Sequence, residues 1–203
     1  MIRNLLLDLG GVLYGVEYHR TTQALGLSDE ALPQLLGDPI LAEYEKGTLS
    51  TEAFLTHWAK RFPTLSRKAL IDAWNAMLLG PLPAAEAVLA QLAKHFSLAL
   101  LSNTNDLHLA IVEPAIAPWR PYFAGMFFSN RLHRRKPDPE IYLHVLDELG
   151  WHPEETLFID DSLSNVEGAR QAGLHVHHFF PPNQPEKLIA IVRPFAASLS
   201  RKT

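Results

Sequence analysis

Five short apolar runs recur along the chain, and longer stretches with helical periodicity separate them. A run of about four to eight apolar residues that stops at glycine or at a polar cluster is typical of a strand buried on both faces. Five strands are therefore predicted, at Ile2–Leu9, Ser97–Ser102, Met126–Ser129, Thr156–Asp160 and Leu174–Phe180. Helical stretches of about ten residues join the later runs, which is the length that a parallel crossover needs. The pattern predicts an α/β fold with a doubly wound parallel sheet.

Two helices have clear start and stop signals. Asp138 can cap a helix over Pro139–Leu149, which has proline in its first position and Gly150 just past its end. A second helix is predicted over Leu163–Ala172, and it stops before Gly173. Both lie between predicted strands, so they serve as crossover helices.

A long insertion separates the first two predicted strands. Connections in compact domains usually have about two to six residues, whereas roughly eighty residues lie here. The stretch from Tyr14 to Gly80 is rich in helical patterns and has its own apolar residues, so we expect an inserted subdomain of about four short helices. The boundaries assigned are residues 1–15 and 81–203 for the core, and residues 16–80 for the insertion.

Composition excludes several classes of protein. The 203 residues are 47% hydrophobic and carry 18 basic against 22 acidic side chains, without a run of five like charges, so a nucleic-acid partner is disfavoured. With no cysteine, there is no disulfide, thiolate nucleophile or cysteine metal site, and any metal must bind oxygen or histidine. No apolar stretch reaches the ~20 residues of a membrane span, so we expect a cytoplasmic protein without a membrane partner.

Polar side chains follow the predicted strands where these strands end. In an open parallel sheet, ligands bind beyond the carboxyl ends of the strands, so residues from separate chain segments should meet in one crevice. Six residues are expected to converge there: Asp8, Ser102, Asn103, Lys136, Asp160 and Asp161.

The chemistry of these residue types fits attack on phosphorus. Asp8 can act as a nucleophile and form an aspartyl-phosphate, and the amides of Gly10 and Gly11 can point at an anion. Attack by one anion on another is opposed by charge. A hard divalent cation removes this opposition, and the adjacent Asp160 and Asp161 offer oxygen ligands to Mg²⁺.

Three further residues could hold the phosphoryl oxygens. The Ser102 hydroxyl, the Lys136 ammonium and the Asn103 amide are all suitable donors. Each also has a plain alternative, because strand-end serine and asparagine often cap helices and a lysine within a basic run is often solvated. The adjacent aspartates could likewise cap the following helix. Only the combined spacing is specific.

The spacing resembles that of the haloacid dehalogenase-like hydrolase superfamily. Four segments match its motifs, and they read LLLDLGGVL, LLSNTN, RRKPDPEIY and LFIDDSLSNVEGA. The resemblance implies a Rossmann-like core with a helical cap inserted after the first motif, here residues 16–80. The DLGG first motif and the cap segment EKGTLSTEAF are similar to those of the sugar-1-phosphate phosphatase subgroup.

The resemblance also implies roles for individual residues. Asp8 is the implied nucleophile, and Ser102 and Lys136 are the implied phosphate binders. The implied magnesium ligands are Asp8, Asp161 and the Gly10 carbonyl. Asp160 would assist directly or through water, and Asn165 falls where the family often has a supporting polar residue, although a place on the helix surface is an equal alternative.

One position departs from the pattern. Most phosphatases of this superfamily have a second aspartate two residues after the nucleophile to protonate the leaving oxygen, whereas this chain has Gly10. General acid–base help supplies about 100- to 10,000-fold. Either another group or water supplies the proton, or the leaving group is acidic enough to depart with little help. We favour the second hypothesis, which predicts a steep dependence of turnover on leaving-group pKa.

Histidines and tyrosines offer weaker candidates. His175 and His177 would share one face of the last strand, but no third ligand lies at a useful spacing. Tyr14 and Tyr18 follow the first motif and could contact a substrate or simply pack.

The leading interpretation is an enzyme, a magnesium-dependent phosphomonoesterase that acts on a small phosphorylated metabolite such as a sugar phosphate. A 2-haloacid dehalogenase is the alternative enzyme, in which the aspartate attacks carbon without metal, and the Asp160–Asp161 pair argues against it. A non-catalytic scaffold is the third possibility because of Gly10. Monomer and homodimer are both open.

Overall fold

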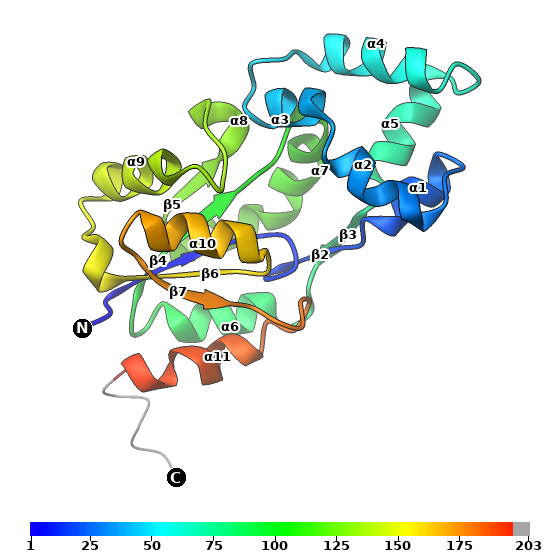
Figure 1. Ribbon diagram of the computed structural model, residues 1–203. Coiled ribbons are helices and arrows are strands. Elements are labelled where there is room, and N and C mark those ends of the chain that lie inside the picture. The colour runs from blue at the N-terminus through cyan, green and yellow to red at the C-terminus, as the bar shows by residue number, and fades with distance from the viewer. Residues whose placement is uncertain (197–203) are drawn as a thin grey trace.

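A five-stranded parallel sheet forms the centre of the fold, in the order β5–β4–β1–β6–β7 (Figure 1). The computed structural model describes residues 1–196. The strands are β1 (Asn4–Leu7), β4 (Ser97–Ser102), β5 (Phe123–Phe128), β6 (Thr156–Asp160) and β7 (His175–His178). All five predicted strands are present, and the parallel α/β sheet is confirmed.

Helices cover both faces of this sheet. The helices that precede a strand of the sheet are α6 (Ala85–Leu92), α7 (Asp106–Ile116), α9 (Pro139–Leu149) and α10 (Leu163–Gln171), and α11 (Lys187–Val192) follows the last strand. Helices α6, α7 and α11 pack in one hydrophobic cluster, and α9 and α10 pack in another. The shorter elements outside the insertion are α8 (Ser129–Leu132) and the 3-10 turns Ala117–Tyr122, Pro153–Glu155 and Arg193–Phe195.

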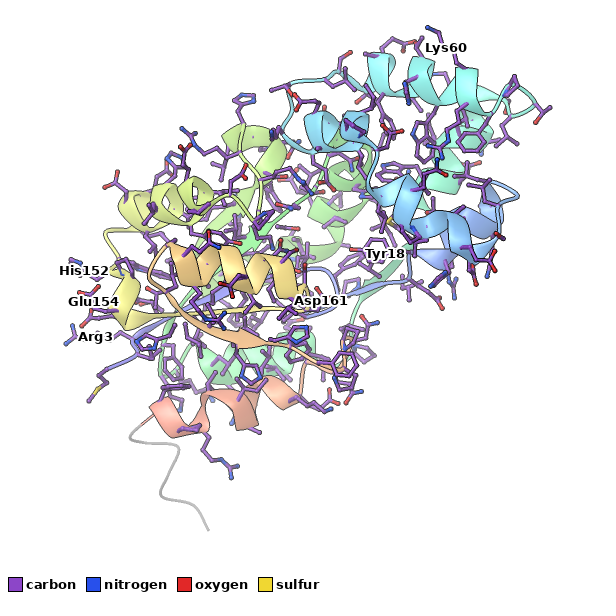
Figure 2. The ribbon with its side chains drawn as sticks, viewed as in Figure 1. Arg3, Tyr18, Lys60, His152, Glu154 and Asp161 are labelled. Carbon is purple, nitrogen blue, oxygen red and sulfur yellow. The ribbon has the colours of Figure 1, made fainter. Side chains whose placement is uncertain are left out.

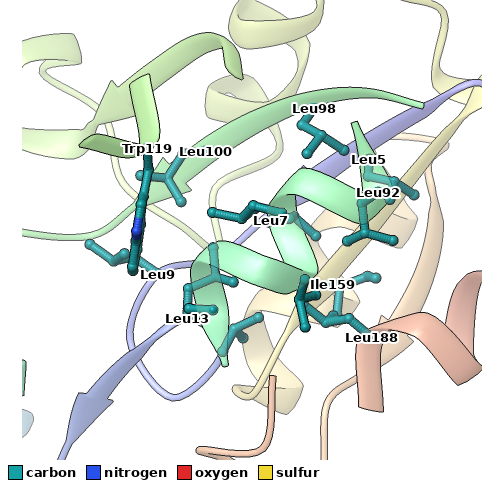
Figure 3. Packing of buried hydrophobic residues seen from close by; sticks show 14 of the residues in the cluster. Leu5, Leu7, Leu9, Leu13, Leu92, Leu98, Leu100, Trp119, Ile159 and Leu188 are labelled. Atoms are coloured by element: carbon teal, nitrogen blue, oxygen red, sulfur yellow. The ribbon is translucent and has the colours of Figure 1, made fainter. Parts of the chain in front are cut away.

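The central strand β1 shows why helices must cover both faces of the sheet. Leu5 and Leu7 point into the cluster that contains Leu92 of α6 and Leu188 of α11, as Figure 3 shows. Leu6 points to the opposite face and lies in the other cluster. Because successive side chains of a strand alternate between faces, an unbroken apolar run is stable only between two helical layers.

Both predicted crossover helices are present, with small differences from the predicted cap and the predicted end. Helix α9 has the predicted bounds, and Gly150 follows it with a φ of 65°. The predicted side-chain cap by Asp138 is wrong, because the Asp138 carboxylate makes no capping hydrogen bond. Its main-chain carbonyl instead accepts the Ile141 amide at 3.2 Å. Helix α10 ends at Gln171, one residue before the predicted end.

The insertion leaves and re-enters the core through two paired strands. Strand β2 (Tyr14–Val16) is antiparallel to β3 (Leu78–Pro81). Five helices lie between them, one more than expected, together with the 3-10 turn Asp29–Ala31: α1 (His19–Ala24), α2 (Leu32–Leu36), α3 (Pro39–Glu45), α4 (Thr51–Arg61) and α5 (Arg67–Asn75). Ser50 and Ser66 cap α4 and α5 through their hydroxyls.

The helices of the insertion enclose a hydrophobic cluster of their own. Phe54 and Trp58 of α4 and Trp74 of α5 are its large buried aromatic residues, with ring centroids 4.9 to 5.4 Å apart. Figure 1 shows this helical body beside the carboxyl edge of the sheet. Among residues 1–196, no helix combines the length and apolar character needed to cross a bilayer.

Candidate active site

Three adjacent strands bring the predicted residues to one edge of the sheet. Asp8 follows β1, Ser102 ends β4 and Asp160 ends β6, and β1 pairs with both of the others. A cavity of about 450 Å³ opens at this edge. Predicted residues that line it are Asp8, Gly10, Ser102, Asn103, Lys136, Asp161 and Asn165. Figure 2 shows Asp161 on the side of the core that faces Tyr18 of the insertion, which also lines the cavity.

Lys136 lies at the centre of this group and is 1% exposed. Its ammonium Nζ donates to Asp8 Oδ1 at 2.6 Å, to Asp160 Oδ2 at 2.7 Å and to the Leu101 carbonyl at 2.9 Å. Burial alone would lower the pKa of Lys136, but the two carboxylates outweigh it and hold that pKa above its ordinary value. An ammonium has three protons, so these three acceptors use all of them.

The carboxylates of Asp8, Asp160 and Asp161 lie together, with one oxygen of each within 4.8 Å of the others. Burial, and then the neighbouring aspartates, raise the pKa of Asp8 to about 8, while Lys136 opposes the rise. Burial and then Asp160 raise the pKa of Asp161 to about 6. Three carboxylates beside one ammonium carry an excess of two negative charges when ionised. This all-oxygen set fits a hard divalent cation such as Mg²⁺.

Asp160 is the most constrained carboxylate and is fully buried. Its Oδ1 accepts the Ser162 amide at 2.7 Å, and Asn165 Nδ2 donates to both Asp160 oxygens at 3.1 Å. Together with Lys136, these donors fix the Asp160 carboxylate from three directions. Asn165 therefore supports the cluster through Asp160, and it is not merely a polar residue on the surface of α10.

The structure gives Asn103 a different contact from the expected one. Its Nδ2 donates to the Lys136 carbonyl, and its Oδ1 accepts the Lys136 amide, both at 2.9 Å. The expected amide donor for a phosphoryl oxygen thus holds the main chain of the lysine. Ser102 is 5% exposed, and its hydroxyl donates to the Asn103 carbonyl at 3.4 Å, which is a long contact.

Gly11 also differs from expectation. Its amide donates to the Tyr14 carbonyl at 2.9 Å, so the proton that was expected to face an anion is used within the loop. Gly11 has a φ of 72°, and an added Cβ would overlap the Asp161 carboxylate. A glycine is needed here because of this close approach. Gly10 lines the cavity.

The histidines of the last strand form no metal site. Within the described part of the chain, the aspartate cluster is the single group of three or more side chains placed to share a metal ion. His178 Nε2 lies 3.0 Å from the main-chain oxygen of Asp161, so this ring contacts the loop that carries a cluster residue.

Sequence reasoning missed the residues that close the cavity from the insertion. Glu45 of α3 and Arg135 both line it, and Arg135 Nη2 lies 2.8 Å from Glu45 Oε2. The only signal was indirect, since Glu45 begins the EKGTLSTEAF segment and Arg135 precedes Lys136. Neither segment shows by itself that the two side chains meet.

The parallel sheet, its acidic edge and the inserted helices define a Rossmann-like α/β protein with an oxygen-rich candidate active site. A family model described as haloacid dehalogenase-like hydrolase matches residues 2–173. The chain belongs to this family, as the sequence motifs predicted.

Curated relatives of similar length are named as phosphatases. D-ribitol-5-phosphate phosphatase of Bacteroides thetaiotaomicron is 30% identical over 198 residues, which cover 90% of this chain and 93% of the relative. A phosphorylated carbohydrates phosphatase of Thermotoga maritima is 29% identical and covers 83% of this chain and 81% of the relative. The chain is thus a hydrolase whose full-length relatives include phosphatases.

Solved structures agree with this placement. A predicted HAD-like hydrolase from Porphyromonas gingivalis has a TM-score of 0.81 at 29% identity, with both chains covered completely. A magnesium complex of a HAD family enzyme from Bacteroides thetaiotaomicron has a TM-score of 0.79 at 28% identity, with 99% of each chain covered. A 2-haloacid dehalogenase from Pseudomonas syringae, at 19% identity and a TM-score of 0.61, shares the fold alone.

Proposed function

We propose that this protein is a magnesium-dependent phosphatase of a small phosphorylated polyol or sugar, and that it forms an aspartyl-phosphate on Asp8. The observation that carries the proposal is the contact of Asp8 with Lys136 at the centre of the carboxylate cluster, in a cavity of metabolite size. The names of the two phosphatase relatives support the substrate class. Residues 16–80 are the proposed cap, and residues 1–15 and 81–203 the proposed core, of which 197–203 lie outside the described residues.

The proposed ligands of Mg²⁺ are Asp8, Asp161 and the Gly10 carbonyl, with Asp160 assisting. When bound, the cation supplies positive charge that favours ionised carboxylates and neutralises the phosphoryl group. Lys136 holds Asp8 Oδ1, so Asp8 Oδ2 is the oxygen assigned to attack.

The proposed reaction has two displacements. An Asp8 oxygen forms a bond to phosphorus while the ester P–O bond breaks, and the leaving oxygen takes a proton from water or from another donor. Water then attacks the same phosphorus, loses a proton, and releases Asp8 and inorganic phosphate. Ser102 is assigned to the phosphoryl oxygens, together with Lys136 once one of its present contacts is exchanged.

The first test is a magnesium-supplemented screen of polyol phosphates, sugar phosphates, nucleotides and acyl phosphates. We expect turnover on polyol or sugar phosphates, and its loss in Asp8→Asn, which keeps the shape but is a poor nucleophile. Halide release from 2-haloacids without Mg²⁺ would instead favour a dehalogenase. No turnover together with a vanadate adduct on Asp8 would favour a non-catalytic protein with an intact site.

Gly10 gives a second test, because the position lacks a general acid. We expect turnover to fall steeply as the pKa of the leaving group rises, and Gly10→Asp to help the poorest leaving groups most. Initial rates on a series of aryl and alkyl phosphates measure both effects. Equal rates along the series would show that another group supplies the proton.

A further inference from the structure

The cavity contains a second charged pair apart from the carboxylate cluster. Glu45 reaches it from the end of α3 in the insertion, and Arg135 reaches it from the core loop next to Lys136. The Glu45 side chain is 16% exposed and the Arg135 side chain 30%. The proposed reaction does not use either side chain.

The pair is incompletely hydrogen-bonded. Arg135 Nη2 forms an ion pair with Glu45 Oε2 at 2.8 Å, and this contact opposes the rise that burial causes in the pKa of Glu45. Apart from this ion pair, Glu45 Oε2 and Arg135 Nε are buried without a hydrogen-bond partner, and a carboxylate oxygen can accept more than one hydrogen bond. Buried polar atoms are nearly always paired, so an acceptor and a donor at the same place in a cavity indicate a site for a polar ligand.

Both residues are held firmly relative to the reaction centre. The Glu45 carbonyl accepts the Ser129 hydroxyl at 2.6 Å, which ties the end of α3 to the core. Arg135 directly precedes Lys136, whose main chain Asn103 holds at two points. The rest of the lining from the insertion is largely apolar and includes Val16, Leu36, Leu41, Trp74, Met77 and Leu78.

We propose that Glu45 and Arg135 bind hydroxyl groups of the leaving alcohol, and so select phosphate esters of polyhydroxylated alcohols. This inference rests on the proposed phosphatase function and names specificity residues for it. A carboxylate accepts a hydrogen bond from one hydroxyl, and a guanidinium N–H donates to the oxygen of another. Because the pair carries opposite charges, it offers no excess positive charge to a second phosphate, so bisphosphates are disfavoured.

The test compares Glu45→Gln with Glu52→Gln on two substrates. Glu52 lies on α4, forms an exposed ion pair with Arg67 and is not among the residues that line the cavity, so it controls for loss of a carboxylate from the insertion. The substrates are the polyol phosphate that the wild type hydrolyses best and p-nitrophenyl phosphate, which has no free hydroxyl. We expect Glu45→Gln to lower kcat/KM for the polyol phosphate by about 10- to 100-fold. The loss on p-nitrophenyl phosphate is expected to be at least about tenfold smaller.

An Arg135→Lys variant provides a second measurement, since lysine keeps the charge but lacks Nε. We expect the loss of kcat/KM in Arg135→Lys to be smaller on deoxy analogues of the polyol phosphate, because these analogues lack the hydroxyl that Arg135 is proposed to contact. Equal losses on both substrates, or losses that do not depend on the hydroxyls, would show that the pair only fastens the insertion to the core and would overturn the proposal.

A binding experiment tests this inference independently of the proposed phosphatase activity. Free ribitol is titrated into the magnesium-loaded protein and followed by NMR chemical shifts. Binding by wild type and Glu52→Gln but not by Glu45→Gln supports the hydroxyl site even if no ester is hydrolysed. Binding that Glu45→Gln leaves intact, or the absence of binding by wild type, overturns it.

Discussion

At the residue scale, Gly11 offers a sharp test of the metal site. A Cβ at Gly11 would overlap the Asp161 carboxylate, whereas a Cβ at Gly26, which has a similar φ of 71°, would meet nothing within 4 Å. Both alanine variants should lose about 1–2 kcal/mol of folding free energy from backbone strain. Only Gly11→Ala also displaces a proposed magnesium ligand.

We therefore expect Gly11→Ala to lower kcat/KM by about 100-fold and to raise the Mg²⁺ concentration needed for half-maximal activity. Gly26→Ala should keep the wild-type magnesium dependence. Steady-state rates across a magnesium titration measure the difference. Identical magnesium curves for the two variants would remove Asp161 from the proposed ligand set.

The residues of the candidate site show how much of its arrangement the sequence predicts. Asp8 and Asp160 could be placed together because parallel strands bring their carboxyl ends to one edge. Asn103 and Gly11 were assigned to an anion, whereas both bind the protein's own main chain. Which of several hydrogen-bond partners a loop residue takes depends on loop conformation, and residue type alone does not encode it.

At the element scale, the contact between α5 and α7 fastens the insertion to the core. Trp74 of α5 donates its Nε1 proton to Asn105 Oδ1, with the two atoms 3.3 Å apart, and Asn105 caps α7. His108 of α7 stacks on Trp74 with ring centroids 4.8 Å apart, and its Nε2 lies 3.3 Å from the Trp74 carbonyl. Since α7 begins just after Ser102, this joint lies directly beside the proposed phosphate site.

The joint should make stability depend on pH. Burial lowers the pKa of His108 from 6.5 to about 4. The unfolded chain therefore takes up a proton at this histidine before the folded chain does, so stability is lost as pH falls from about 6.5 to 4. Between pH 7 and pH 5, His108 should remove about 2 kcal/mol from the free energy of unfolding.

Urea unfolding of wild type and His108→Gln at several pH values measures this effect. The difference between the two pH profiles isolates His108 from the other titrating groups. We expect the wild type to lose more stability than the variant on acidification. Parallel profiles would contradict a buried neutral imidazole.

The prediction of helices and strands was most accurate where a single physical requirement, such as burial on both faces, determines the residue types. Strand β1 is apolar from Leu5 to Leu7 because it is paired on both sides and covered on both faces. The insertion was recognised from its length, but five helices formed where about four were expected. Short helices such as α2 depend on contacts with their neighbours more than on their own pattern.

At the scale of the whole molecule, metal binding should stabilise the fold. The carboxylate cluster joins the ends of β1 and β6, so a cation bound there binds the folded chain and not the unfolded one. At a Mg²⁺ concentration of 100 Kd, we expect about 2.7 kcal/mol of stabilisation. This corresponds to a rise in Tm of about 5–10 °C.

Thermal unfolding with Mg²⁺, and again after chelation, measures the rise. Asp161→Asn removes a proposed ligand and should lose most of it. A wild-type Tm that does not respond to millimolar Mg²⁺ would count against the cluster as a cation site.

The three contacts of Lys136 have a consequence for the sequence of events in solution. An arriving phosphate ion meets an ammonium whose protons are already committed to Asp8, Asp160 and Leu101, and beside it a surplus of negative charge. A cation bound to these carboxylates would replace Lys136 as their counter-charge and would free one of its protons for the anion. We therefore expect ordered binding, in which phosphate binds only after the metal.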